Sequence, residues 1–326
     1  MVGFIGRRVA WTLLILFAIS VMVFVIFFAI PGIDPVVSLA GRNPSPATVA
    51  AIRHTFGLDL PLPAQYFLMM KHIFIDRDLV SYTSGLPILP QVTAAAPVTL
   101  SLVAGAAVIW LVVSMAMGVL AAAFYGRWLD RVLTIVALVA ISTPVFWLGA
   151  MANLITQGQL HKTFLFGWVP PAGYIALTQD PVGWLRQMII PWLVLSFAFV
   201  GLYSRVLRSS LIEVQNEDFV RTARSKGLSE RRVMVRHVLR MSLIPFVSLF
   251  GLDVGSLIGG GVVLVEVVFG LPGVGMLAFQ AASGLDLPTI MVTVIYGAFF
   301  IVIANLVVDI TYAWLDPRIR QAGSRP

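Results

Sequence analysis

The feature that most constrains this chain is a series of six long apolar stretches, each close to the length that crosses a lipid bilayer. They are approximately Val9–Ile30, Pro97–Phe124, Val132–Ile155, Met188–Ser204, Leu243–Val265 and Pro288–Trp314. A hydrocarbon core about 30 Å thick needs about 20 apolar residues of helix to cross it. Because backbone polar groups find no water in that core, such stretches are expected to be helical. The sequence therefore predicts an all-α polytopic membrane protein with about six transmembrane helices.

Composition supports this fold class and excludes several others. Charged residues make up 11% of the chain and hydrophobic residues 59%, whereas a soluble domain carries about a quarter charged residues. Cysteine is absent, which excludes a disulfide framework and cysteine metal sites. The first apolar stretch follows Arg7 and Arg8. It is longer than the roughly 7–15 apolar residues of a signal peptide, so we predict that it is retained as a span.

Lysine and arginine are distributed unevenly between the two sides of the predicted spans. With the N-terminus inside, sixteen of the 22 lie in inner segments and six in outer segments, although the outer segments are longer. Cytoplasmic segments carry such an excess, so both termini are predicted to be cytoplasmic. We therefore interpret the net charge of +7 as a topology signal, and it does not point to a nucleic-acid partner.

The spans divide the chain into four parts. These are an N-terminal transmembrane helix (1–31), an extracytoplasmic segment (32–96), a core of five transmembrane helices (97–314) and a cytoplasmic tail (315–326). The core includes a cytoplasmic loop (205–242) and an outer loop (266–287).

The extracytoplasmic segment is long and patterned. Thr48 is expected to cap a short helix that stops at Gly57. The range Pro61–Ile75 then places Leu62, Tyr66, Met69, Met70 and Ile73 at helical spacing. Two interpretations stay open for this segment. It is an amphipathic cover on the outer membrane surface, or it is a docking surface for an extracytoplasmic partner.

The cytoplasmic loop carries the most specific pattern. Asn216 is expected to cap a helix whose first turn holds Glu217 and Asp218, which suit the positive end of the helix dipole. Gly227 can adopt the left-handed conformation that ends this helix, and Ser229 is expected to cap a second one. The loop holds nine basic residues, which are Arg205, Arg208, Arg221, Arg224, Lys226, Arg231, Arg232, Arg236 and Arg240. Two caps around one glycine predict a structured docking element rather than a solvated basic loop.

This loop resembles a known motif. Residues 218–227 read Asp-Phe-Val-Arg-Thr-Ala-Arg-Ser-Lys-Gly. They are similar to the "EAA" loop of ATP-binding-cassette importer permeases, in the variant of the dipeptide/oligopeptide/nickel permease family. Where the general motif has Glu-Ala-Ala-x-x-x-Gly, this chain has Arg221, Thr222 and Ala223, followed by Gly227.

Further blocks resemble the same family. The range Gly57–Tyr66 is similar to its N-terminal part. Its last outer loop is matched by Glu266, Phe269, Pro272, Gly273, Gly275 and Asp286, in that order. Its closing signature is matched by Asn305, Asp309, Tyr312, Asp316, Pro317 and Arg318. The resemblance therefore covers nearly the whole chain.

The resemblance implies a fold and a set of partners. It implies the type I importer permease fold and half of a translocation pathway for di- to oligopeptides, in a bacterial or archaeal cell membrane. A second permease, usually a different chain, would complete the pathway, and an extracytoplasmic binding protein would meet the last outer loop. Two separate ATPase subunits would hold ATP and Mg²⁺. Their docking site would comprise Asp218, Arg221, Ala223, Gly227, Ser229, Glu230, Arg231 and Arg232.

The chain itself lacks the signatures of an enzyme. A P-loop needs Gly-Lys-Ser/Thr after a glycine-rich turn, and the three lysines, Lys71, Lys162 and Lys226, occur in no such string. All four histidines lie outside the predicted spans, which argues against an intramembrane enzyme. No catalytic residue, metal ligand or cofactor is therefore predicted. Nickel and glutathione-like cargo stay open as alternatives to peptides, although nothing at metal-ligand spacing within the spans favours nickel.

The fifth apolar stretch holds two further candidate features. Asp253 is the one carboxylate near the centre of a span. It faces the translocation path and contacts a peptide amine or water, or it pairs with an arginine or a backbone group of a neighbouring helix. If the path were proton-coupled, Asp253 would instead serve a secondary transporter. Gly251, Gly255 and Gly259 form a small-residue stripe. The stripe packs within the bundle or, as the family resemblance favours, forms the seam with the second permease.

Overall fold

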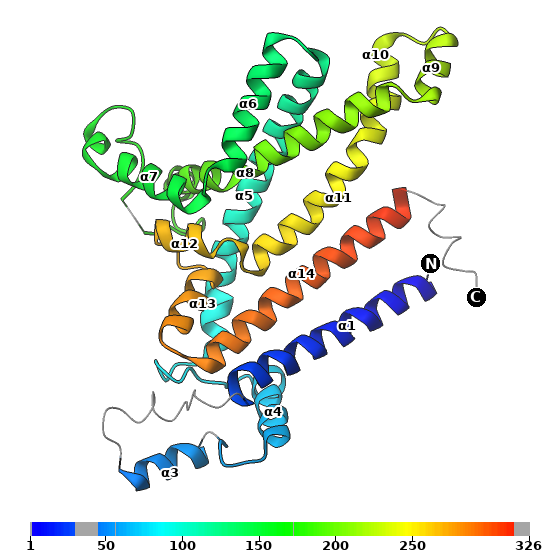
Figure 1. Cartoon of the computed structure of the whole chain (residues 1–326). Coiled ribbons are helices and arrows are strands. Elements are labelled where there is room, and N and C mark those ends of the chain that lie inside the picture. The colour runs from blue at the N-terminus through cyan, green and yellow to red at the C-terminus, as the bar shows by residue number, and fades with distance from the viewer. Residues whose placement is uncertain (1, 30–44, 56, 172, 316–326) are drawn as a thin grey trace. The chain divides into compact units, whose positions relative to one another are not determined.

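The computed structural model describes residues 2–29, 45–55, 57–171 and 173–315, and its regular structure is helical (Figure 1). The only strand-like feature in these ranges is an isolated bridge between Val80 and Pro87. The α-helices are α1 (Val2–Phe24), α3 (Pro46–Thr55), α4 (Leu62–Lys71), α5 (Ile88–Ala123), α6 (Trp128–Ser142), α7 (Val145–Gln157), α8 (Pro181–Gln215), α9 (Asp218–Ser225), α10 (Glu230–Val233), α11 (Arg240–Ser256), α12 (Val263–Phe269), α13 (Val274–Ser283) and α14 (Leu287–Leu315). Short π- or 3₁₀-turns are η1 (Val25–Ala29), η2 (His72–Asp76), η3 (Gln159–Lys162), η4 (Met234–Leu239) and η5 (Leu257–Gly261). The predicted all-α fold class is confirmed.

Five helices in the described ranges are long and apolar enough to cross a membrane. They cover Gly6–Phe28, Ile88–Ala123, Pro181–Gln215, Glu230–Gly261 and Leu287–Val308. Each contains most of one of the predicted apolar stretches, and the three central ones extend well beyond it. The cytoplasmic loop predicted at 205–242 is therefore helical at both ends, and its non-helical connections are short.

The predicted span Val132–Ile155 is wrong as a single helix. It is a pair of helices, α6 and α7, bent by 95°. The break lies at Thr143 and Pro144, both of which have extended backbone conformations. Proline disfavours the helical conformation in the residue before it, so the Thr-Pro pair in the sequence is the physical cause of the bend. A second bent pair, α12 and α13, forms an angle of 88°.

The described helices group into two compact units. The first consists of residues 1–100, 255–267 and 271–326, and the second of residues 101–254 and 268–270. Both α5 and the helix that ends in η5 pass from one unit into the other.

In the first unit, α1 and α13 pack along α14. One part of its core consists of Val23, Phe24, Tyr66, Met69 and Met291. The Tyr66 ring meets Phe24 edge-on at 5.4 Å, and its hydroxyl lies 2.8 Å from the Ser20 hydroxyl. The apolar side of the predicted Pro61–Ile75 helix therefore packs in part against the protein's own first helix.

The helix predicted before Gly57 begins earlier than expected. Helix α3 starts at Pro46, so Thr48 lies inside it rather than at its N-cap. Proline is favoured in the first turn of a helix because it needs no hydrogen-bonded N–H there. The predicted stop is confirmed, since α3 ends at Thr55 and Gly57 has a φ of +63°.

In the second unit, α6 and α7 pack on α8. The C-terminal part of α5 joins them where the Trp110 ring stacks on Phe199 at 4.5 Å. Helices α5 and α8 also approach closely at Gly105, where a Cβ atom would overlap the Trp192 indole. The Trp192 indole N–H donates to the Ser101 carbonyl at 3.0 Å.

Candidate functional site

The connection between α8 and α10, which the sequence predicts to be cytoplasmic, consists of the short helix α9 and two turns. Helix α9 begins after Glu217, whose backbone is extended, and Glu217 is therefore its N-cap. The prediction that Asn216 caps this helix is wrong by one residue. The Asn216 side-chain amide donates to the Ile212 carbonyl at 2.9 Å, so Asn216 closes α8 instead. Asparagine side chains can satisfy either end of a helix, and the sequence alone does not distinguish the two.

The turn between α9 and α10 has the predicted form. Gly227 has a φ of +75°, the left-handed region that favours glycine, and its N–H donates to the Arg224 carbonyl at 2.9 Å. Ser229 is the N-cap of α10 by its extended backbone, although its side chain makes no capping hydrogen bond. Helix α10 then continues through η4 and α11 as one long helix, Glu230–Gly261. The turn is thus joined directly to a membrane span.

An ion pair that the sequence analysis missed bridges this turn. The Arg224 guanidinium donates from Nη2 to Oε1 of Glu230 at 2.7 Å and from Nε to Oε2 at 3.1 Å. This carboxylate raises the pKa of Arg224 further above its usual value, chiefly through the hydrogen bond. The opposite charges on either side of the glycine were the signal that could have revealed the pair.

The predicted docking residues divide into an exposed set and a buried one. Ala223 is the buried member, and Val220 and Val233, which were not among the predicted docking residues, are buried as well. The Ala223 side chain faces inward, and its inclusion in the docking loop stays a prediction. The exposed members are Asp218, Arg221, Gly227, Ser229, Glu230, Arg231 and Arg232.

A second ion pair, also missed, ties α6 to α8. Arg208 donates from Nε to Oδ1 of Asp130 at 2.6 Å and from Nη2 to Oδ2 at 2.9 Å. The same carboxylate accepts the Gly126 N–H at 2.9 Å, and the guanidinium lies 5.3 Å from the centre of the Tyr125 ring. The turn between α5 and α6 is therefore held onto the part of α8 that leads to α9.

Glu266 is the centre of a buried network in the first unit. Its carboxylate accepts the Thr99 hydroxyl at 2.6 Å and the Met276 N–H at 2.8 Å. The Thr99 hydroxyl in turn accepts the Val274 N–H at 2.9 Å. A Cβ atom at Gly273 would overlap the Glu266 carboxylate, which explains why glycine stands there.

The outer loop predicted at 266–287 therefore needs correction. Its turns were expected to face a binding protein, but most of it is helical, in the bent pair α12 and α13. Pro272 is exposed, whereas Glu266, Phe269, Gly273, Gly275 and Asp286 are buried within the chain. The buried residues shape the loop from inside, and contact of this loop with a binding protein stays a prediction.

Asp286 joins this region to the extracytoplasmic segment. Its carboxylate accepts the Ser81 hydroxyl at 2.5 Å, the Tyr82 N–H at 2.9 Å and the Thr289 hydroxyl at 2.7 Å. The Tyr82 hydroxyl is buried close to this negative charge, and burial, with the charge of Asp286 second, holds the pKa of Tyr82 well above its usual range.

The small-residue stripe packs within the first unit. Added Cβ atoms at Gly255 and Gly259 would meet Ala304 and Ile301, respectively, on α14. These contacts support the interpretation that the stripe packs within the bundle, and the seam with a second permease stays a prediction. Gly251 lies in the second unit and is half-buried.

Asp253 lies in the second unit and is half-buried. Its Oδ2 accepts a hydrogen bond of 2.6 Å from the Tyr203 hydroxyl of α8. Its partner is thus a neighbouring helix, as one of the two interpretations expected, but the partner group is a phenol rather than an arginine or a backbone group.

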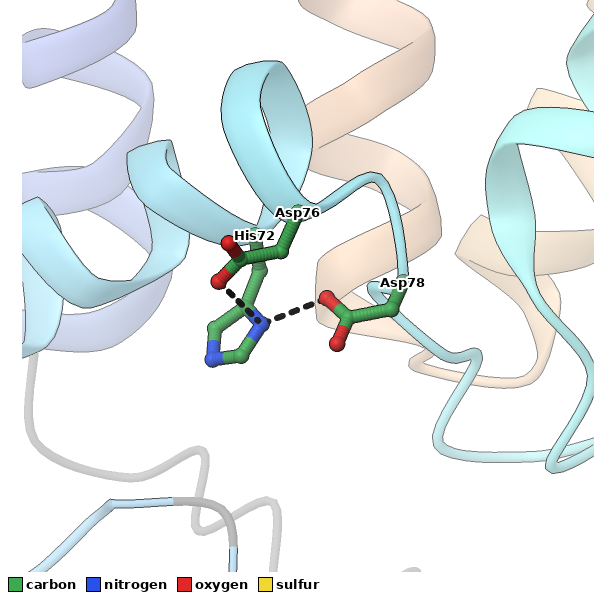
Figure 2. A group of neighbouring side chains, drawn as sticks. All are labelled: His72, Asp76 and Asp78. Carbon is green, nitrogen blue, oxygen red and sulfur yellow. Dashed lines mark hydrogen bonds and ion pairs between the residues drawn. The ribbon is translucent and has the colours of Figure 1, made fainter.

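Figure 2 shows a further polar cluster, at the end of α4, that the sequence analysis did not single out. The His72 Nδ1 atom lies 2.6 Å from Asp78 Oδ1 and 3.8 Å from Asp76 Oδ2. These atoms are of types that ligate metal ions, but Asp76 already pairs with Lys71 at 3.0 Å. The hydrogen bond from His72 is the main cause that lowers the pKa of Asp78. We assign the cluster a structural role in closing the turn.

Part of the resembling closing signature falls beyond what the structure describes. Asn305 lies on α14 and is exposed. Asp309 and Tyr312 are on the same helix, but their side chains lie outside the described part. Residues Asp316, Pro317 and Arg318 lie outside the described residues altogether.

Comparison with known families covers most of the chain. Residues 114–321 match the family described as the binding-protein-dependent transport system inner membrane component. Residues 1–103 match the description of its N-terminal part.

Individual relatives are similar over almost their whole length. A Brucella abortus protein provisionally named a peptide transport system permease protein is 36% identical over 320 residues, which is 98% of this chain and 99% of the relative. An Escherichia coli protein provisionally named a D,D-dipeptide transport system permease protein is 35% identical, over 97% of both chains. The glutathione transport system permease protein of Salmonella choleraesuis is 34% identical, over 98% of this chain and 99% of its own length.

These matches confirm the resemblance drawn from the cytoplasmic loop and the outer block. They also agree with the several apolar helices of a multi-pass membrane protein. The chain therefore belongs to the family of binding-protein-dependent transport system inner membrane components, and it is a transport subunit rather than an enzyme.

Proposed function

We propose that this chain is the permease subunit of an ATP-driven importer and forms half of the translocation pathway for di- to oligopeptides. The observation that carries the proposal is the exposed, basic α9–Gly227–α10 turn, which is continuous with two membrane spans. The names of the relatives support peptide cargo, because they include peptide and D,D-dipeptide permeases. A glutathione permease is also among them, and glutathione is itself a tripeptide.

Coupling of ATP hydrolysis to transport requires a rigid connection between the ATPase subunit and the membrane spans. Helix α8 ends at Gln215 and the next long helix begins at Glu230, so few residues separate the two spans. The Arg224–Glu230 pair closes this short connection. A force applied to α9 would therefore move both spans together instead of being absorbed by a flexible loop. We propose that α9 and the following turn sit in a groove of an ATPase subunit, and that closure of the ATPase pair drives alternating access.

The partners follow from this role. Two ATPase subunits supply ATP hydrolysis with Mg²⁺, and this chain binds neither. A second permease, a homologous but different chain, completes the pathway, and an extracytoplasmic binding protein delivers the peptide. The excess of basic residues on one side of the spans supports cytoplasmic termini, in the cell membrane of a bacterium or archaeon.

The first experiment tests the docking turn with a matched glycine pair. Gly227 and Gly85 both have positive φ, +75° and +68°, and open space around them. Alanine at either position imposes a similar backbone strain, but only Gly227 lies in the proposed docking turn. We expect Gly227→Ala to reduce recovery of the ATPase subunits with the purified permease, whereas Gly85→Ala retains them. Equal recovery from both variants would contradict the docking site.

A second experiment tests the energy source and the cargo. The purified assembly is placed in proteoliposomes with its binding protein, and uptake of labelled tripeptide, glutathione and Ni²⁺ is measured. ATP-dependent uptake of the tripeptide is expected. Uptake driven by a proton gradient without ATP would favour a secondary transporter, and uptake of glutathione or Ni²⁺ alone would reassign the cargo.

A further inference from the structure

Asp253 is a carboxylate without a cationic partner in the apolar C-terminal half of a long helix. It belongs to the long helix Glu230–Gly261, and the structure pairs it with no lysine, arginine or histidine in the described part of the chain. Its hydrogen bond from Tyr203 uses Oδ2, and no described group donates to Oδ1. An ionised carboxylate can accept about four hydrogen bonds, so most of its capacity is unused.

The position of Asp253 restricts what it can face. Ionisable side chains within membrane spans face the protein interior or a water-filled path, because lipid cannot solvate them. Asp253 is half-buried rather than enclosed, so its second oxygen is accessible from outside the chain. Water or a group that is not part of this chain can therefore donate to it.

The partner hydroxyl is held rigidly by aromatic packing within the second unit. Tyr203 is fully buried, and its ring meets Phe246 edge-on at 5.1 Å and Trp110 at 5.7 Å. Trp110 is also fully buried between Phe199 and Phe250, at 4.5 and 5.2 Å. Because these rings fix the phenol, its O–H points at Asp253 without further ordering.

Two of these rings lie one helical turn from one member of the Tyr203–Asp253 pair. Phe250 precedes Asp253 by three residues on the same helix, and Phe199 precedes Tyr203 by four residues on α8, so each lies one turn away on the same face. Both are half-buried. A carboxylate bordered by aromatic rings suits an organic cation, because the ring faces and the negative charge attract it together.

We propose that Asp253, oriented by Tyr203 and bordered by Phe250, binds the α-ammonium group of a peptide in the translocation path. A primary ammonium has three N–H donors and fits a carboxylate that has one oxygen free and the other held by a phenol. This inference rests on the proposed function, since it names the part of the peptide that the permease recognises.

The test uses photolabelling, so that it does not depend on recognition by the binding protein. The purified permease–ATPase assembly in nanodiscs is exposed to a tripeptide with a diazirine in its N-terminal side chain. One form has a free α-amine and the other is N-acetylated. Label on this chain is located by mass spectrometry after proteolysis. We expect the free amine to label the segments around Tyr203 and Asp253 about tenfold more than the acetylated form does, since a charge-assisted hydrogen bond is lost.

Variants test whether the labelling preference for the free amine depends on the Asp253 carboxylate. Asp253→Asn is expected to lower free-amine labelling to the acetylated level, and Asp253→Glu is expected to restore part of the difference. Glu213→Gln is the matched control, because Glu213 is an exposed carboxylate on α8, and it is expected to leave labelling unchanged. If Asp253→Asn does not assemble, the same labelling is measured with Tyr203→Phe. This variant is expected to lose about half of the preference for the free amine.

Four outcomes would overturn the inference, of which three concern the preference for the free amine. They are equal labelling by the two peptides in the wild type, an unchanged preference in Asp253→Asn, or, where that variant does not assemble, an unchanged preference in Tyr203→Phe. An equal loss of both labels in Asp253→Asn would likewise reject it and assign Asp253 to contact with the second permease. Failure of the proposed function is separate, because it would appear as absent ATP-driven tripeptide uptake by the wild-type assembly with its binding protein.

Discussion

Arg224 and Glu230 form a two-pronged ion pair across Gly227, with Nη2–Oε1 and Nε–Oε2 distances of 2.7 and 3.1 Å. The pair joins the last turn of α9 to the first turn of α10, on the two sides of a left-handed glycine. It thus fixes the angle between two short helices whose exposed faces carry most of the basic residues of the turn.

Reversal of this pair tests whether its geometry matters for coupling. Each single change, Arg224→Glu or Glu230→Arg, places like charges together and is expected to reduce peptide-stimulated ATP hydrolysis by the reconstituted assembly. The double exchange restores the attraction and is expected to recover a large part of the activity. Because both side chains are exposed, the melting temperature of the assembly is expected to change little in any variant. No recovery in the double exchange would contradict a bracing role.

The Glu266 network predicts a marked loss of stability on removal of one hydroxyl. In Thr99→Val, the buried Glu266 Oε1 and the Val274 N–H both lose their partner. A buried polar group left without a hydrogen bond costs about 1–3 kcal/mol. Thermal unfolding of the purified assembly should shift to lower temperature accordingly.

Thr293→Val is the control for this change. Thr293 is buried in the same unit, and its hydroxyl donates to backbone carbonyls of its own helix. Removal of this hydroxyl leaves no group outside its own helix without a partner. Thr293→Val should therefore lower the unfolding temperature less than Thr99→Val does. An equal shift in both variants would show that loss of a buried hydroxyl, rather than the network, is responsible.

The contact of the glycine stripe with α14 predicts a steric effect. A Cβ at Gly259 would lie 2.6 Å from Ile301 Cγ1 and 2.9 Å from the Gly297 carbonyl oxygen. Overpacking of this kind costs about 1–3 kcal/mol, so Gly259→Ala should lower the unfolding temperature. Gly6→Ala is the control, because a Cβ at Gly6 meets nothing within 4 Å. If Gly259→Ala were as stable as Gly6→Ala, the stripe would be free for another partner.

The His72–Asp78 contact predicts a pH dependence at the end of α4. The pKa of Asp78 is lowered in the folded chain, chiefly by the hydrogen bond from His72. A depressed carboxyl pKa means that the stabilisation is fully present above the ordinary aspartate pKa of about 4, and is lost as the pH falls through the lower folded value. Wild type should therefore exceed Asp78→Asn in unfolding temperature at pH 6.

That difference should disappear at pH values below the folded pKa of Asp78. The exposed Asp59 provides a control, and Asp59→Asn is expected to follow the wild type throughout. A difference between wild type and Asp78→Asn that stayed constant with pH would exclude the contact as its source.

Features that depend on neighbouring residues or on composition could be predicted from the sequence alone. Long apolar stretches predicted helices because only a helix satisfies the backbone in lipid, and five of the six appear as long helices. Gly227 predicted a left-handed turn because other residues are strained there. The family was also evident from strings of neighbouring residues in the cytoplasmic loop and the outer block.

Two predictions were wrong at positions where the sequence contains two competing local signals. Thr143 and Pro144 mark a break inside an apolar stretch, but hydrophobicity alone favoured one continuous span. Asn216 could close one helix or open the next, and the structure uses it for the first purpose. In both cases the residue that marks the observed structure is present in the sequence. A more general pattern beside it favoured the wrong prediction.

Tertiary structure alone decided which distant residues meet. Thr99 and Glu266, Asp130 and Arg208, and Tyr203 and Asp253 are far apart in the chain. Their pairing depends on how helices cross, which periodicity in one helix does not specify. The direction of the Gly255–Gly259 stripe was undetermined for the same reason, because a small-residue face suits any close helix equally. The sequence determined the long apolar helices and the turn at Gly227, and packing determined which distant polar groups pair.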